Sequence, residues 1–409
     1  MLAFIRVTCC IAGCLMVAGG VAAAQEVQID PGPGGNIVAQ RVDGRTVYVA
    51  PDQRDIQPGQ WWFYWSLRLR AAAETPVKIV FTNQNPLGMR GPATSRDGGL
   101  TWQWLGADRV QAFRHEGRPA WSFEVCVPAD QHEMLVAYCP HYRECHLRAW
   151  LARQSADAPL RVEELCRSRQ GRSVELLRAG CLDRERCRGM VLLTSRHHAC
   201  EAMATYAMEG FLSAVLADDA LGRRWRENWE VVAVPFMDKD GVENGDSGKN
   251  RAPHDHNRDY NDQPLYPEVA AWMKLGSTLQ DRVVATMDLH CPSIRGQWND
   301  LAYFVGPRDE GFWNKEQRYA ATLARVRSGP IPFRAQDCLA FGTAWNTGGN
   351  FAQGRSCSAW SISAFPKAAL VGSLELPYAE SLGVEVTADS ARAFGRDLAH
   401  ALAEHLDAR

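Results

Sequence analysis

Hydrophobic and polar positions follow two different patterns along the chain. From about residue 45 to residue 151, short runs rich in Val, Tyr, Phe and Trp are separated by Pro, Gly and Asp. Short runs of this kind, divided by turn residues, are typical of an all-β antiparallel sandwich. The expected strands are residues 46–50, 61–69, 77–82, 102–105, 121–127 and 134–139.

From residue 174 on, apolar runs alternate with segments of helical spacing. The expected strands are residues 190–194, 229–235 and 282–289, and the expected helices follow Cys200, lie near residues 266–275 and cover residues 387–408. Strands that alternate with helices predict an α/β/α domain with a mixed, largely parallel sheet.

The first 24 residues carry a third pattern. A lone Arg6 precedes an apolar run that ends in small residues, with Ala22 and Ala24 spaced as in a signal cleavage site. This predicts an exported protein, periplasmic or secreted. A lipoprotein anchor at Cys14 is the less favoured alternative, because the apolar run continues past that cysteine. No later stretch has the ~20 apolar residues of a transmembrane helix.

The expected organisation is a signal peptide at residues 1–24, a β-sandwich at residues 25–155 and an α/β/α domain at residues 156–409. The 45 basic and 47 acidic residues nearly cancel, so nucleic acid is not an expected partner. Of 13 cysteines, three precede residue 24 and ten follow it. An even number in an exported chain predicts disulfides. Cys181/Cys187 and Cys338/Cys357 are plausible pairs, although spacing leaves the connectivity open.

Five consecutive aromatic residues occupy positions 61–65. Such a cluster could stack against carbohydrate, but bulky residues on a strand are also what the core of a sandwich requires. We favour the core strand.

A candidate metal site lies where the strand at 190–194 turns into a helix. His198 and Glu201 are three residues apart and share a helical face, and nitrogen with carboxylate oxygen suits zinc. An HxxE pair alone is a weak indication. The strand at 282–289 leads directly to His290, which completes a His₂Glu set with a fourth position left for water. Asp288 either orients that imidazole or forms a structural hydrogen bond.

Polar residues elsewhere add candidate chemistry. Arg258 beside Asn257 has the fork geometry that holds a carboxylate, and Arg251 could stabilise an oxyanion nearer the metal. Either arginine could equally be solvated surface. Glu375 interrupts an apolar strand, where a carboxylate is costly without a purpose or a partner. It is either a general base or the partner of an arginine.

These segments occur in an order that resembles the zinc metallocarboxypeptidase family. The motifs are His198-x-x-Glu201, Asp240-Gly241-Val242, Arg251, Asp255-x-Asn257-Arg258-x-Tyr260, Asp288-Leu289-His290 and Leu374-Glu375-Leu376. Residues 61–64, 83–92 and 136–142 are similar to the β-sandwich that precedes the catalytic domain in the cytosolic-carboxypeptidase-like branch.

The resemblance implies hydrolysis of C-terminal amino acids from peptides or proteins by one zinc ion. It implies roles for seven residues: His198, Glu201 and His290 as zinc ligands, Asn257 and Arg258 as the clamp for the terminal carboxylate, Arg251 as the carbonyl polariser and Glu375 as the base.

The chain departs from this family in three places. Asp238-Lys239 stands where the family has Asn-Pro, and Cys200 replaces a glycine. Phe351, nine residues before Trp360, aligns with an expected tyrosine, so the loss of a hydroxyl would affect substrate handling before metal binding.

Three alternative functions are considered: hydrolysis of cell-wall peptides, zinc-dependent deacylation of N-acyl amino acids, and a non-catalytic module that binds glycan or protein. The deacylase branch typically lacks an N-terminal sandwich. Glu375 and an open fourth zinc position argue against a structural zinc site, which is usually closed by four protein ligands. The preferred side chain and the oligomeric state are not predicted.

Overall fold

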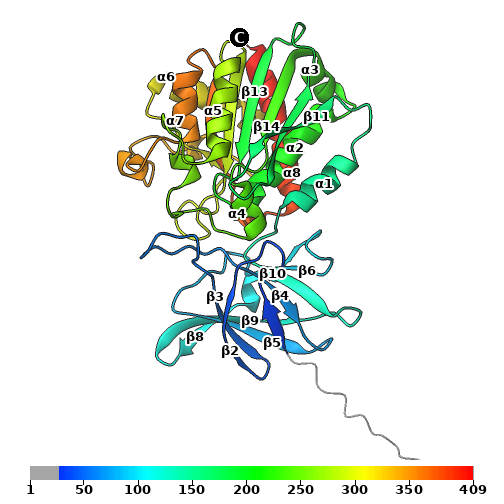
Figure 1. The fold of residues 1–409 in the computed structure, drawn as a ribbon, viewed down its shortest axis with the longest axis vertical. Helices are drawn as coiled ribbons and strands as arrows, with labels where there is room; N and C mark the ends of the chain where they lie inside the picture. Colours follow the sequence, from blue (N-terminus) through cyan, green and yellow to red (C-terminus); the bar gives the residue numbers. More distant parts are fainter. Residues whose placement is uncertain (1–26, 409) are drawn as a thin grey trace, which may run out of the picture.

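The computed structural model describes residues 27–408, and both the predicted signal peptide at residues 1–24 and Cys14 lie outside them. Figure 1 shows a lower part built from the N-terminal strands and an upper part in which helices flank a sheet. This arrangement confirms the predicted fold class, a β-sandwich followed by an α/β/α domain. The boundary at residue 155 stays a prediction.

Two five-stranded sheets form the lower part, in the orders β1-β4-β10-β6-β7 and β2-β3-β5-β9-β8. All pairs are antiparallel except β3 and β5, which run parallel. Every second residue of β3 is buried, as expected for a strand with one face on the core. The strands are β1 (Gln28–Asp30), β2 (Val38–Asp43), β3 (Thr46–Ala50), β4 (Ser66–Arg70), β5 (Pro76–Thr82), β6 (Ala93–Ser95), β7 (Gln103–Trp104), β8 (Gln111–His115), β9 (Arg118–Cys126) and β10 (Glu133–Ala137).

The upper part contains a seven-stranded sheet in the order β11-β12-β14-β13-β15-β17-β16. Its central strands β14, β13, β15 and β17 are parallel, whereas β11, β12 and β16 pair antiparallel at the edges. The strands are β11 (Leu160–Arg167), β12 (Ser173–Gly180), β13 (Gly189–Ser195), β14 (Trp229–Val234), β15 (Val283–His290), β16 (Tyr303–Phe304) and β17 (Leu370–Glu375). A small hairpin of β18 (Glu380–Ser381) and β19 (Val384–Glu385) follows.

Helices cover both faces of this sheet. Val191 and Leu193 of β13 belong to the hydrophobic core shared with α2, α6 and α8, whereas Met190 and Leu192 belong to the core shared with α5 and α7. A strand buried on both sides is expected in a parallel sheet with two helical layers. The helices are α1 (Glu144–Ala152), α2 (Ala202–Leu216), α3 (Ala220–Asn228), α4 (Lys239–Asn244), α5 (Pro267–Leu279), α6 (Glu310–Val326), α7 (Cys357–Ala364) and α8 (Ala388–Asp407).

The aromatic run at residues 61–65 precedes β4 and is not itself a strand. Trp65 is fully buried and packs against Phe81 inside the sandwich, with ring centroids 4.9 Å apart. Phe63 packs against Tyr378 of the upper domain at 5.7 Å. Residues 63–65 are therefore buried as the core hypothesis predicts, whereas Trp61 and Trp62 are half-buried, and the run contacts both domains.

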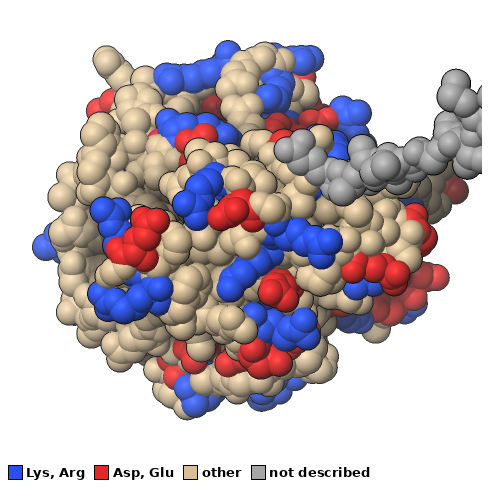
Figure 2. Space-filling view, turned by 90° about the horizontal axis from the view of Figure 1, so that it is seen from below, with Lys and Arg blue, Asp and Glu red and all other residues tan. Residues whose placement is uncertain are grey.

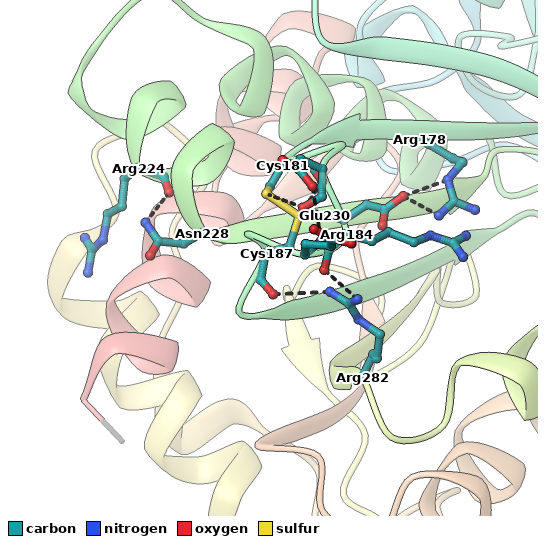
Figure 3. The surroundings of a disulfide bond; sticks show 10 residues. Arg178, Cys181, Arg184, Cys187, Arg224, Asn228, Glu230 and Arg282 are labelled. Carbon is teal, nitrogen blue, oxygen red and sulfur yellow. Dashed lines mark hydrogen bonds and ion pairs between the residues drawn. A yellow bond between two sulfur atoms is a disulfide. The ribbon is translucent and has the colours of Figure 1, made fainter.

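One predicted disulfide is present and the other is not. Cys181 and Cys187 are bonded in the connection between β12 and β13, where Arg282 donates a hydrogen bond to the carbonyl oxygen of Cys187 at 3.2 Å (Figure 3). Cys338 and Cys357 are free thiols, so that pairing is wrong. They are separated because Cys338 packs against the α2 and α8 core and Cys357 lies in the α5 and α7 core.

Surface features of residues 27–408 add little to the functional argument. No helix in this range is long and apolar enough to cross a membrane. Seen from below in Figure 2, lysine and arginine side chains are interspersed with aspartate and glutamate and do not form a one-sign patch.

A carboxyl group in α6 is buried without a hydrogen-bond partner among residues 27–408. It belongs to Glu316, which is 0% exposed and whose two carboxylate oxygens are both unpaired within this range. Burial raises the pKa of Glu316 well above its ordinary value. The Glu316 carboxyl group therefore keeps its proton in the folded protein at pH values where the same group in the unfolded chain has lost it.

We expect Glu316→Gln to stabilise the protein at pH 8 and to have little effect at pH 4. A folded-state pKa above the unfolded one lowers the free energy of unfolding by about 1.4 kcal/mol per pH unit between the two values. Melting temperatures of both proteins at both pH values test this. Glu310→Gln, which changes an exposed residue in the first turn of the same helix, is the control. Destabilisation by Glu316→Gln at pH 8 would contradict the assignment.

Candidate active site

Three buried side chains converge at the carboxyl ends of β13 and β15. The Nδ1 atom of His198 lies 2.8 Å from one carboxylate oxygen of Glu201, and the Nδ1 atom of His290 lies 2.8 Å from the other. Ligand atoms of the three residues all lie within 4.8 Å of one another. Burial alone would raise the pKa of Glu201, but the two imidazoles hold it well below its ordinary value. The result is an ionised carboxylate between two nitrogens, a donor set that fits zinc.

Each ligand imidazole uses its second nitrogen on another carboxylate. His198 Nε2 lies 3.2 Å from Asp255, and His290 Nε2 lies 2.7 Å from Asp288. A carboxylate at the far nitrogen fixes the ring and its tautomer, so that Nδ1 is left for a metal. The sequence predicts that Asp288 either orients the His290 imidazole or forms a structural hydrogen bond, and its contact with His290 Nε2 favours the first role.

A neighbouring cluster of His197, Asp288 and Cys357 also has metal-ligating atom types within range. Both ring nitrogens of His197 are already used, at 2.9 Å from Asp288 and 2.7 Å from the Tyr260 hydroxyl. Burial raises the pKa of the Cys357 thiol, which disfavours the thiolate that metals require. This cluster is better described as support for the first one.

A cavity of about 650 Å³ opens beside His198 and His290. Glu375 ends β17, is paired in register with His290 and lines this cavity. Its Oε2 atom has no hydrogen-bond partner in the part of the chain that the structure describes, and burial raises the pKa of Glu375 to about 7. A carboxylate with a free oxygen and a raised pKa has the properties of a general base.

Arg258 lines the same cavity and is held from behind by backbone carbonyls. Its NH1 donates to Asn257 O at 2.7 Å, and its Nε and NH2 donate to Asn350 O at 3.1 and 3.0 Å. Three of the five guanidinium N–H groups are thereby used, and the others can meet a carboxylate.

Known proteins were compared with this chain. No family model matches it. Cytosolic carboxypeptidase 3 of Mus musculus is 25% identical over 269 residues, which cover 59% of this chain and 26% of that protein. Cytosolic carboxypeptidase 6 of Caenorhabditis elegans is 22% identical over 250 residues, covering 57% and 54%. The chain thus spans between about a quarter and a half of the length of these curated relatives.

Solved structures agree in fold over nearly the whole chain. A metallo-carboxypeptidase from Burkholderia cenocepacia superimposes with a TM-score of 0.74 at 18% identity, covering 93% of this chain and 99% of that one. A Pseudomonas aeruginosa metallo-carboxypeptidase, solved with (2-guanidinoethylmercapto)succinic acid, gives 0.71 at 19% identity with the same coverage. The chain is thus similar in sequence to cytosolic carboxypeptidases and shares its fold with metallo-carboxypeptidases.

Asn257 and Arg251 make contacts other than those that the resemblance implies for them. Asn257 lines the cavity, but its amide is occupied: Oδ1 accepts a hydrogen bond from the Cys357 backbone at 2.9 Å, and Nδ2 lies 3.0 Å from His290 Nε2. Its visible contacts position His290 and α7.

Arg251 is not brought to the main cavity. Its NH2 lies 2.5 Å from Asp238, 3.2 Å from Asp246 and 3.7 Å from Asp55, and it lines a separate, smaller cavity. Three carboxylates around one guanidinium explain this position, because they provide the charge that a buried arginine needs.

Two further residues line the main cavity and bear on its chemistry. Phe351 lines it, and the Arg258 guanidinium lies 5.0 Å from the centre of its ring. Lys249 also lines the cavity, which His198 and Glu375 line as well. Lys249 is not among the residues predicted from the sequence, because a lysine in a polar loop carries no distinguishing pattern.

Proposed function

We propose that this chain is a zinc-dependent carboxypeptidase that removes C-terminal amino acids from peptides or proteins. The observation that carries the proposal is one cavity lined by both histidines of the His₂Glu group, by a carboxylate with a free oxygen and by a buried arginine. The resemblance to cytosolic carboxypeptidases over more than half of the chain supports it.

His198, Glu201 and His290 would hold the ion. When bound, zinc supplies a Lewis acid and lowers the pKa of a water molecule that it binds. Glu375 accepts a proton from the attacking water and delivers it to the leaving amine. Arg258 binds the terminal carboxylate, so that only the last peptide bond reaches Glu375.

Zinc is favoured over other ions by two imidazole nitrogens and one carboxylate. The ligand group contains three protein residues within the described range. Structural zinc sites are usually closed by four protein ligands, so three support a catalytic role over a binding module.

We also propose that the protein is exported. The pattern of residues 1–24 supports a secretory signal. The Cys181–Cys187 bridge is independent support, because disulfides persist mainly in oxidising compartments.

We expect peptides with a free C-terminal carboxylate to be trimmed and the matching peptide amides to be very poor substrates. Amidation removes the charge that Arg258 is placed to bind, and loss of a buried charge-assisted pair costs about 2–5 kcal/mol. Mass spectrometry of paired acid and amide peptides, incubated with zinc-loaded protein, measures the difference. Equal turnover of both members would contradict the role of Arg258 and point to a deacylase or an endopeptidase.

Substitutions of the two glutamates of the site should affect zinc content and turnover differently. Glu201→Gln replaces a charged ligand with a neutral one, so zinc content and activity should fall together. Glu375→Gln keeps the shape but removes the basic oxygen, so the rate should fall by about 10²–10⁴ at unchanged zinc content. Metal analysis and turnover on the same preparations separate the two roles. Normal turnover in Glu375→Gln would rule it out as the base, and loss of zinc would make it a ligand.

A further inference from the structure

We propose that Lys249 is a further catalytic residue, whose ammonium group stabilises the negative charge that develops on the scissile carbonyl oxygen. The inference rests on the proposed carboxypeptidase function. It assigns to Lys249 the role that Arg251 was expected to fill and is not positioned for.

The reaction requires a cation at this point. When the oxygen of water adds to the carbonyl carbon, the carbonyl oxygen becomes an oxyanion, and donors aimed at it are a large part of hydrolytic catalysis. The ammonium group of Lys249 donates a hydrogen bond to this oxygen. The proton of the water passes to Glu375 and then to the leaving amine as the C–N bond breaks.

Three cationic side chains line the main cavity: Lys249, Arg258 and Arg308. Arg258 is held by backbone carbonyls in the orientation that suits a terminal carboxylate. Arg308 is exposed and lies over the ring of Phe341, 6.0 Å from its centre. Lys249 is therefore the cation left for the reacting carbonyl.

The backbone before Lys249 is pressed against the metal-ligand turn. Gly248 has a φ of 75°, and a Cβ atom added there would lie 2.3 Å from the backbone nitrogen of Ala199. Ser247 O accepts a hydrogen bond from the Cys200 backbone at 2.9 Å. Only glycine allows this approach, which ties the loop to the segment that carries His198 and Glu201.

The N-terminal sandwich holds the same loop from its other side. Asp55 accepts hydrogen bonds from the backbone of Ser247 at 3.1 Å and of Gly248 at 2.7 Å. The Lys249 ammonium lies 5.9 Å from the ring centre of Trp62. Asp55 is thus a positioning residue, and both domains contribute to the placement of Lys249.

The test compares Lys249→Gln with Lys249→Arg and with Lys274→Gln, which makes the same change at an exposed position on α5. We expect kcat of Lys249→Gln to fall by about 10²–10³ with a smaller change in KM, the effect of losing one oxyanion donor. Lys249→Arg should recover part of the loss, and Lys274→Gln should match the wild type. Zinc content and melting temperature should be unchanged in all three variants.

Binding gives a second readout. A phosphonate analogue of the peptide mimics the oxyanion. Calorimetry should show that Lys249→Gln binds this analogue more weakly than the wild type does, by a factor similar to the loss in kcat. Binding of the released amino acid should be little affected. Wild-type kcat, or unchanged phosphonate binding, in Lys249→Gln would overturn this inference alone. A zinc-loaded wild-type protein that releases no C-terminal amino acid would overturn the proposed function, and this inference with it.

The role of Asp55 is tested by a double-mutant cycle. If Asp55 acts through Lys249, Asp55→Ala should lower kcat in the wild type and have little further effect in Lys249→Gln. Additive losses in the two backgrounds would overturn the positioning role.

Discussion

The parallel register of β13, β15 and β17 is the constraint on which the site depends. Ser195 pairs with Leu289 and His290 with Glu375, so the chain segments that carry His198, Glu201, His290 and Glu375 leave the sheet at one edge. The carboxyl ends of parallel strands are where open α/β sheets bind ligands. The buried carboxylates of Glu201, Asp255 and Asp288 are tolerated at this edge because each has a partner: Glu201 faces the imidazoles of His198 and His290, and Asp255 and Asp288 each hold one of these two rings from its far side. Removing one member would leave an unpaired buried charge, which is costly.

The N-terminal sandwich is a structural part of this arrangement. Arg54 reaches across the junction to Asp246 at 3.0 Å, and the Asn36 side chain donates to Gly245 O at 3.0 Å. Phe63 adds an apolar contact to Tyr378, which follows the strand that ends in Glu375. The loop between residues 245 and 251 is therefore held by both domains, and we expect the sandwich to influence turnover through this loop.

Much of the fold, and the grouping of His198, Glu201 and His290, could be predicted because periodicity indicated the strands and the HxxE spacing indicated two residues on one face. Residues 46–50 and 229–235 read as strands from local pattern, and the ends of two such strands carried His198 and His290. The loop residues could not be placed in the same way. Lys249 and Arg251 are two positions apart in a polar segment, and the sequence does not distinguish them. In the folded chain, Arg251 pairs with carboxylates distributed along the sequence and lies outside the main cavity; they are Asp55, Asp238 and Asp246. Cys338 and Cys357 looked like a pair in sequence, but different hydrophobic cores separate them.

The central claim is that His198, Glu201 and His290 hold a divalent metal beside Glu375. The most direct measurement is anomalous X-ray diffraction at the zinc absorption edge from crystals of the zinc-loaded protein. We predict one strong peak, which marks a zinc ion about 2.0–2.2 Å from Nδ1 of both histidines and from the Glu201 carboxylate. A peak within the cluster of His197, Asp288 and Cys357, or the absence of a peak at Glu201, would contradict the account.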